Sequence, residues 1–356
     1  MQNHYTININ AGQVSLTFNN QSGSTPDLEI DSMATAHIKQ ILRDQFTPRK
    51  RDNLHLADAY QLAGMDNGVD KAVRLATCAR WLEFAVPPDG ASDRYKIVKT
   101  SSCHVRLCPV CQWRRSLNTF RNLASVYSDP SLSKYKHMFV TLTQKNVDPA
   151  DLKEEIEKIS EAYSRMMRRK PLKDLVKGYT RTIEITVSSD GTYHPHIHAI
   201  WTVARSYGHK EYIRQADLCK IWAEALDLEY IPVCDLRMIK NMNGKSVAEV
   251  AKYSVKPSDY ISDRLDQTAD LIRVLDPALD GKRFVSYGGV VRDVKQRLFS
   301  KKNLEDLETD LISKEWEDWE RLIYEWHFSS GSYRQIECSA GSNGAVANAP
   351  LNKIGK

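Results

Sequence analysis

The alternation of apolar and polar residues predicts a regular order of strands and helices through the middle of the chain. Four segments have the strand pattern: His137 to Thr143, Tyr179 to Ser188, His194 to Val203 and Ile231 to Ile239. Helical periodicity covers Asp148 to about Arg169, about Glu211 to Leu226 and Ser246 to Val255, with Asp148 as the expected cap. The order β-α-β-β-α-β-α predicts an α+β fold with a ferredoxin-like, split β-α-β antiparallel sheet.

The flanking segments have weaker patterns. Asp70 to Phe84 predicts a helix-to-strand segment, and the chain beyond Pro257 predicts helices to about Asp280, then a short strand and turn over Lys282 to Val291. Leu304 to Trp326 predicts an acidic amphipathic helix. We expect residues 1–52 to be weakly ordered, apart from a short helix around Ile38 to Phe46 and a basic joint at Pro48 to Arg51. The Gly- and Ser-rich end from Ser339 is expected to be disordered.

The loop between the second and third strands, Ser189-Asp190-Gly191, decides which of their residues face each other. A three-residue loop ending in Gly pairs Ser188 with Thr192 and places Glu184 opposite His196. A two-residue Asp190-Gly191 turn would place Glu184 opposite Ile197 instead. We favour the first register because it gives a carboxylate in the middle of a sheet a partner, but the chain alone leaves both open.

His196 and His198 are two residues apart, so on a strand their imidazoles point to the same face. Two imidazoles side by side make half of a divalent-metal site, and Glu184 is the candidate third ligand in the favoured register. The alternative is a pair of ordinary strand histidines that form hydrogen bonds or face solvent.

Four of the seven cysteines lie within 34 residues: Cys78, Cys103, Cys108 and Cys111. Cys108 and Cys111 form a C-x2-C pair, which holds one Zn²⁺ from a tight turn, and two further thiolates complete a tetrahedron. The site would be closed and therefore structural. The alternative is a set of buried free thiols.

Glu249, Tyr253 and Lys256 fall at i, i+4 and i+7 of the helix predicted over Ser246 to Val255, which places them on one stripe. This pattern indicates a tyrosine nucleophile with an acid one turn away and a lysine that holds phosphate or phenolate charge. The alternatives are an ordinary half-buried tyrosine and a glutamate that pairs only with Lys245 or Lys252.

Charge is unevenly distributed along the 356 residues, whose 42% hydrophobic content predicts a folded protein. Residues 164–182 carry seven bases against one acid, residues 101–124 carry no acid, and residues 303–327 carry nine acids against two bases. The basic segments suit a polyanion, although a solvated face is the alternative. The candidate DNA-binding residues are Arg106, Arg114, Arg115, Arg121, Arg168, Arg169 and Lys170. The chain has no apolar run near the ~20 residues of a membrane span and no apolar signal region, so we expect a cytoplasmic protein.

Together, these parts resemble the HUH endonucleases, and more closely the replication initiator (Rep) proteins of rolling-circle plasmids of the Gram-positive type. Phe139 to Thr143 is similar to their first motif, His194 to His198 to their metal motif, and Glu249 to Lys256 to their tyrosine motif. The cysteine segment also resembles that of this plasmid subgroup. The resemblance covers about Cys78 to Tyr287. The chain departs from many HUH proteins in having a single tyrosine in the motif, which puts a two-tyrosine strand-transfer cycle in doubt.

The resemblance implies a bacterial, metal-dependent endonuclease that nicks one strand at a plasmid double-strand origin. Tyr253 would form a 5′-phosphotyrosine, Mg²⁺ or Mn²⁺ would bind Glu184 and the two histidines, and Glu249 would act in termination. The implied partners are double- and single-stranded origin DNA, host helicase and polymerase, and a second copy in a homodimer. The alternatives are a single-tyrosine HUH transposase or mobilisation relaxase, and a non-enzymatic zinc-containing DNA-binding regulator.

We expect five units along the chain. These are an N-terminal region of unknown role (1–69), a cysteine-rich zinc module (70–125), an HUH catalytic domain (126–275), a C-terminal strand with the acidic helix (276–335) and a tail (336–356).

Overall fold

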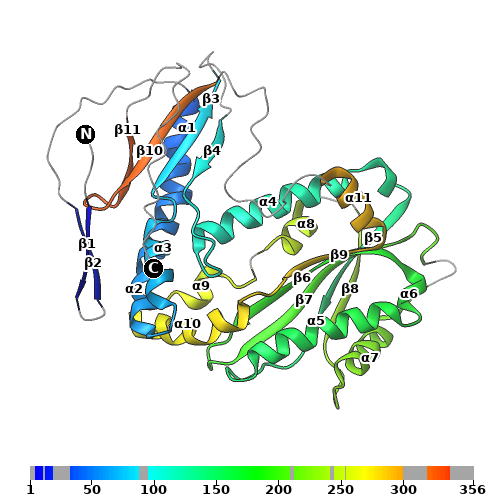
Figure 1. The fold of residues 1–356 in the computed structure, drawn as a ribbon. Helices are drawn as coiled ribbons and strands as arrows, with labels where there is room; N and C mark the ends of the chain where they lie inside the picture. Colours follow the sequence, from blue (N-terminus) through cyan, green and yellow to red (C-terminus); the bar gives the residue numbers. More distant parts are fainter. Residues whose placement is uncertain are drawn as a thin grey trace.

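The computed structural model describes residues 5–10, 13–18, 33–87, 95–208, 212–240, 244–252, 254–299 and 319–336. These residues form two larger antiparallel sheets and one two-stranded hairpin, with helices packed around them (Figure 1). The predicted α+β class with antiparallel sheets is confirmed. None of the described helices is long and apolar enough to cross a bilayer.

The larger sheet has the strand order β8-β5-β7-β6-β9, and every neighbouring pair is antiparallel. Its strands are β5 (Tyr135–Leu142), β6 (Val176–Val187), β7 (Tyr193–Ala204), β8 (Cys234–Ile239) and β9 (Val285–Gly288). Between them in sequence lie α5 (Leu152–Arg168), the short α6 (Leu172–Leu175) and α7 (Gln215–Leu226). The predicted order of four strands and two long helices is therefore found, with β9 added at one edge.

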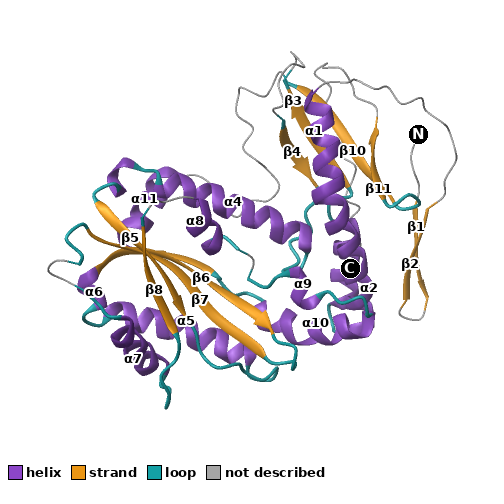
Figure 2. Ribbon diagram, turned by 180° about the vertical axis from the view of Figure 1, so that it is seen from behind, coloured by secondary structure: helices purple, strands orange, loops and turns teal. Residues whose placement is uncertain are grey.

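The sheet has helices on both faces because side chains alternate along each strand. Helices α5 and α7 cover one face, where the indole nitrogen of Trp201 donates to the Tyr163 hydroxyl at 2.9 Å. The other face receives α4 (Pro109–Tyr127), α8 (Gly244–Val250) and α11 (Gly289–Phe299), as Figure 2 shows. There Phe139 and Ile200 pack in one cluster with Val250.

The β6–β7 hairpin has the favoured register. Ser188 N donates to Thr192 O at 2.9 Å, and Gly191 has a left-handed φ of 82°. Glu184 pairs with His196 across the two strands, as predicted. Gly suits this loop position because a residue with a Cβ rarely adopts positive φ.

The second sheet has the order β11-β10-β3-β4 and joins distant parts of the chain. Its strands are β3 (Trp81–Val86), β4 (Lys96–Thr100), β10 (Glu320–His327) and β11 (Ser332–Ile336). The sequence predicts an acidic helix over Leu304 to Trp326. Residues 304–318 lie outside the described residues, and the prediction is wrong for Glu320 to Trp326, which belong to strand β10. Leu322, Tyr324 and Trp326 are buried at every second position, which a strand allows and a helix does not.

Helices lie around the junction of the two sheets, together with a separate N-terminal hairpin (Figure 1). They are α1 (Met33–Ile41), the π-helical η1 (Leu42–Phe46), α2 (Thr47–Ala63), α3 (Gly68–Thr77), α9 (Pro257–Tyr260) and α10 (Leu265–Leu279). The hairpin is β1 (Tyr5–Asn10) and β2 (Gln13–Phe18).

The short helix expected around Ile38 to Phe46 is found, as part of α1 and as η1. Three other local expectations are wrong. Residues 33–37 and 47–52 are also helical, not weakly ordered, and the predicted basic joint at Pro48 to Arg51 is the first turn of α2, since Pro is favoured there. Helix α5 begins at Leu152 without a side-chain cap, because Asp148 lies in the turn before it. The expected disordered tail lies outside the described residues.

Gly289 begins α11 at a point where the chain passes very close to β6. Its φ is +53°, and a Cβ there would lie 2.1 Å from the Lys177 carbonyl oxygen. Gly281 has a similar φ of +64° but nothing within 4 Å of its Cβ position, so it is a matched control. We expect Gly281→Ala to lower the free energy of unfolding by about 1–2 kcal/mol, and Gly289→Ala by about 2 kcal/mol more. Urea unfolding measures both, and equal losses would mean that the close approach relaxes freely.

Candidate active site

The sheet register brings Glu184, His196 and His198 together on the face that α4 and α8 cover. The Oε2 atom of Glu184 lies 3.3 Å from His198 Nε2 and 3.7 Å from His196 Nε2. One ligand atom from each of the three residues lies within 4.8 Å of the others. Two imidazole nitrogens and one carboxylate oxygen that converge in this way are able to hold a divalent ion.

The other ring nitrogen of each histidine also has a partner. His196 Nδ1 lies 3.0 Å from the His194 carbonyl oxygen, and His198 Nδ1 lies 3.2 Å from the Thr141 hydroxyl. A proton on Nδ1 of His196 leaves Nε2 as the ligating atom, and such outer contacts orient metal-binding histidines. Sequence reasoning assigned no role to Thr141. Its place in β5, directly opposite His198, could have revealed one.

Glu184 is almost completely buried, with 4% of its side chain exposed. Burial alone would raise the pKa of this carboxyl, but hydrogen bonds from His196 and His198 and the positive charge of Lys256 outweigh it and hold the pKa below its usual range. The Lys256 ammonium lies 3.2 Å from Glu184 Oε1, and this carboxylate raises the pKa of Lys256. The structure therefore places Lys256 beside the candidate metal ligands.

The expected single helical stripe of Glu249, Tyr253 and Lys256 is wrong, because α8 ends at Val250. The Ser254 carbonyl instead accepts a hydrogen bond from Ile185 N of β6 at 2.8 Å, and Pro257 disfavours a helical residue before it. Tyr253 itself lies outside the described residues. Glu249 forms an ion pair with Lys252, which is the simple pairing that the sequence left open.

Helix α4 contacts the chain on both sides of position 253. Ser116 Oγ donates to the Ala251 carbonyl at 2.6 Å. The Tyr260 hydroxyl donates to the Leu107 carbonyl at 2.5 Å and accepts from the Gln112 side-chain amide at 3.1 Å. Tyr260 is fully buried. Contacts from α4, and from Leu107 just before it, therefore position the segment that follows α8.

The four predicted cysteines form one buried cluster near the first turn of α4. The Sγ atom of Cys78 lies 3.6 Å from those of Cys108 and Cys111, and Cys103 Sγ lies 3.7 Å from Cys111 Sγ. Burial raises the pKa of the Cys108 thiol, whereas hydrogen bonds from Cys103 and Cys108 lower that of Cys111. Four sulfur atoms at these separations match the donor set of a closed zinc site.

The predicted DNA-binding cations differ in exposure. Arg114 is buried and donates to Ser102 Oγ, and half-buried Arg106 donates to the Lys282 carbonyl. Arg115 is also half-buried. The exposed members of the set are Arg121 on α4 and Arg168, Arg169 and Lys170 at the end of α5. The structure thus separates internal guanidinium groups from those that remain at the surface.

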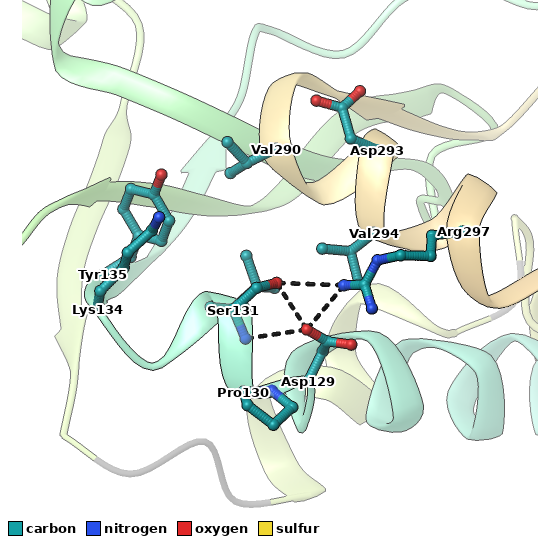
Figure 3. Close-up of a pocket in the computed structure, with 10 residues that line it drawn as sticks. Asp129, Pro130, Ser131, Lys134, Tyr135, Val290, Asp293, Val294 and Arg297 are labelled. Atoms are coloured by element: carbon teal, nitrogen blue, oxygen red, sulfur yellow. Dashed lines mark hydrogen bonds and ion pairs between the residues drawn. The ribbon is translucent and has the colours of Figure 1, made fainter.

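A hollow of about 650 Å³ lies between the α4–β5 connection, which includes the 3-10 turn η2 (Pro130–Leu132), and α11. Figure 3 shows Arg297 reaching across it to Asp129 at 2.9 Å and Ser131 at 3.3 Å. None of the predicted catalytic or metal-binding residues lines this hollow. It is therefore separate from the candidate active site.

Comparisons with known proteins place the chain among replication proteins. A family model described as "Replication protein" matches residues 94–334. "Protein rep" of Lentilactobacillus hilgardii is 31% identical over 297 residues, which cover 79% of this chain and 91% of the relative. "Protein rep" of Bacillus amyloliquefaciens is 34% identical over 302 residues, which cover 78% and 87%. No solved structure matches the chain.

The chain therefore belongs to the Replication protein family. The predicted resemblance to the Rep proteins of rolling-circle plasmids is confirmed.

The geometry predicts which residues bind a divalent ion. We expect His196→Ala and His198→Ala each to weaken Mn²⁺ binding by tenfold or more, since each removes a nitrogen ligand from the cluster. His194→Gln is the control, because the His194 ring stacks on His196 with ring centroids 5.2 Å apart but belongs to none of the three candidate ligands, and the variant keeps the backbone carbonyl that His196 Nδ1 contacts. Electron paramagnetic resonance counts free Mn²⁺ directly. Unchanged binding in both alanine variants would contradict this ligand set.

Proposed function

We propose that this protein is a plasmid rolling-circle replication initiator that nicks one DNA strand at the double-strand origin. The observation that carries the proposal is the convergence of Glu184, His196 and His198, with Lys256 paired to the same carboxylate. Family membership supports the same reading. The order β8-β5-β7-β6 of the catalytic sheet supports an HUH core of the split β-α-β type.

In the proposed reaction Tyr253 is the nucleophile. Its phenolic oxygen forms a bond to the scissile phosphorus and gives up its proton, the bond from phosphorus to the 3′-oxygen breaks, and that oxygen takes up a proton. The products are a 5′-phosphotyrosine and a free 3′-hydroxyl. A phenol with a pKa of ~10 needs nearby positive charge to react at neutral pH. We assign that role to Lys256, which is three residues along the chain from Tyr253 and forms an ion pair with Glu184.

Glu184, His196 and His198 fit a divalent ion such as Mg²⁺ or Mn²⁺ by their donor set. When bound, such an ion reduces the negative charge of a phosphate and orients it. The residues of the chain position that site: Thr141 and the His194 carbonyl orient the imidazoles, and β6 holds Glu184 Oε2 3.3 Å from His198 Nε2 and 3.7 Å from His196 Nε2. The cysteine cluster fits a structural Zn²⁺ by its four sulfur atoms.

We further assign DNA contacts to the exposed cations Arg121, Arg168, Arg169 and Lys170, and to the half-buried Arg115 on α4. Such contacts to phosphates weaken as the salt concentration rises. Protein binding releases counterions from the DNA, and this release is less favourable in concentrated salt. Origin DNA in double- and single-stranded form is the partner that this function requires. The same proposal includes host helicase and polymerase as partners, and a homodimer as the assembly. It also includes the division of the chain into a cysteine module and a catalytic domain.

Nicking tests the proposed nucleophile. We expect Tyr253→Phe to abolish both the nicking of supercoiled origin plasmid and the covalent protein–DNA adduct, because it removes the attacking oxygen. Origin binding should stay within a few-fold of wild type. Tyr212→Phe is the control, because Tyr212 is an exposed tyrosine outside the motif. A DNA adduct that mass spectrometry locates on any other tyrosine would overturn the assignment.

Glu249 is the proposed general base for termination. A single-tyrosine initiator must cut a second time after one round, and a water molecule activated by a carboxylate would release the new strand. We expect Glu249→Gln to keep initiation nicking but to accumulate multimeric single strands.

The ion pair with Lys252 offers a matched control for this prediction. Lys252→Gln removes the pair and keeps the carboxylate, so it should terminate normally. Replication products on a plasmid template distinguish the two variants. A termination defect of equal size in both would assign the effect to the ion pair, and normal termination in Glu249→Gln would reject the base.

A further inference from the structure

Lys50 on α2 carries a buried positive charge. Its side chain is completely inaccessible to solvent, and its ammonium donates to the carbonyls of Ala76 and Cys78, each at 2.6 Å. No ion pair joins it to an acidic residue among the described part of the chain. Lys71 on the neighbouring α3 differs, because it pairs with Asp276 at 2.5 Å. An uncompensated buried ammonium is costly, so its surroundings need an anionic group.

Lys50 reaches the cysteine cluster directly, because it donates to the backbone carbonyl of one of its members, Cys78. Arg80 is a second cation in the same surroundings. Four thiolates around one divalent ion carry a net charge of minus two, and they would be the missing counter-charge.

Asn53 supplies a second and independent observation. It is completely buried one turn after Lys50, its Oδ1 accepts from the Cys108 thiol at 3.2 Å, and its Nδ2 has no hydrogen-bond partner among the residues that the structure describes. A thiolate accepts hydrogen bonds but donates none. If Cys108 is a thiolate, the amide rotated by half a turn would aim Nδ2 at the sulfur. That rotation would give the unpaired donor its partner.

We propose that Lys50 and Asn53 are outer residues of the cysteine metal centre, with Lys50 offsetting its negative charge and Asn53 donating to the Cys108 thiolate. The inference rests on the proposed structural Zn²⁺ and assigns a role to α2, which lies before the cysteine motifs. The competing explanation is purely structural, because Lys50 also satisfies carbonyls at the end of α3.

The test uses the full-length protein, with Zn²⁺ affinity measured by competition with a chelator and Co²⁺ absorption as the reporter of thiolate ligation. We expect Lys50→Met to bind Zn²⁺ about 10–100-fold more weakly than wild type, as loss of outer-shell partners does elsewhere. Asn53→Asp should also weaken binding, because it puts a second anion beside Cys108. Arg74→Met is the control. Like Lys50, Arg74 donates to the backbone carbonyl of a cluster cysteine, Cys103, but its side chain is 43% exposed and not buried.

The melting temperature with and without Zn²⁺ separates the two explanations. In the proposed role, Zn²⁺ stabilises Lys50→Met less than it stabilises wild type, by the amount that a 10–100-fold weaker affinity implies, while the metal-free protein is unchanged or more stable. An equal loss with and without metal, together with Zn²⁺ affinity within twofold of wild type, would overturn the inference and leave the zinc site intact. If wild type and Cys108→Ser alike show no thiolate–Co²⁺ absorption, the zinc site itself fails.

Discussion

The register of the β6–β7 hairpin is the constraint on which the candidate active site depends. A shift of one residue would turn every side chain of a strand to the other face of the sheet. Asp190 Oδ1 accepts from Thr192 N at 3.0 Å, and Gly191 takes the left-handed conformation, so the loop has three residues. Glu184 consequently faces His196 and not Ile197, and the metal-ligand set on that face exists only in this register.

Helix α4 links the cysteine cluster to the segment that follows α8. It begins at the cysteine cluster, with Cys108 as its N-cap residue and Cys111 in its first turn. Gln112 and Ser116, one turn apart, then contact the segment that carries Tyr260 and Ala251. A metal ion that orders the start of α4 would therefore also support the chain around position 253. In the proposed reaction, the cysteine centre would thus support the geometry of the site and take no part in the chemistry.

Backbone pairing between distant segments explains why the local patterns were misleading in two places. The segment around Trp326 carries apolar residues that fit a helical stripe, but it forms a strand that pairs with β3, more than 200 residues earlier in the chain. The segment after Val250 has helical periodicity, yet its Ser254 carbonyl bonds to β6. In both cases a strand edge provided backbone partners that no local pattern encodes.

The sequence by itself determined the elements whose signals are local. Alternation defined β5 to β8, the Ser189-Asp190-Gly191 loop and its glycine favoured one register, and C-x2-C spacing marked the cysteine cluster. Only the tertiary structure decided the contacts between segments far apart in the chain. It buried Lys50 beside Cys78, aimed Thr141 at His198 and brought Lys256 to Glu184. Such contacts depend on how the elements pack, and packing is determined by the whole chain rather than by any window of it.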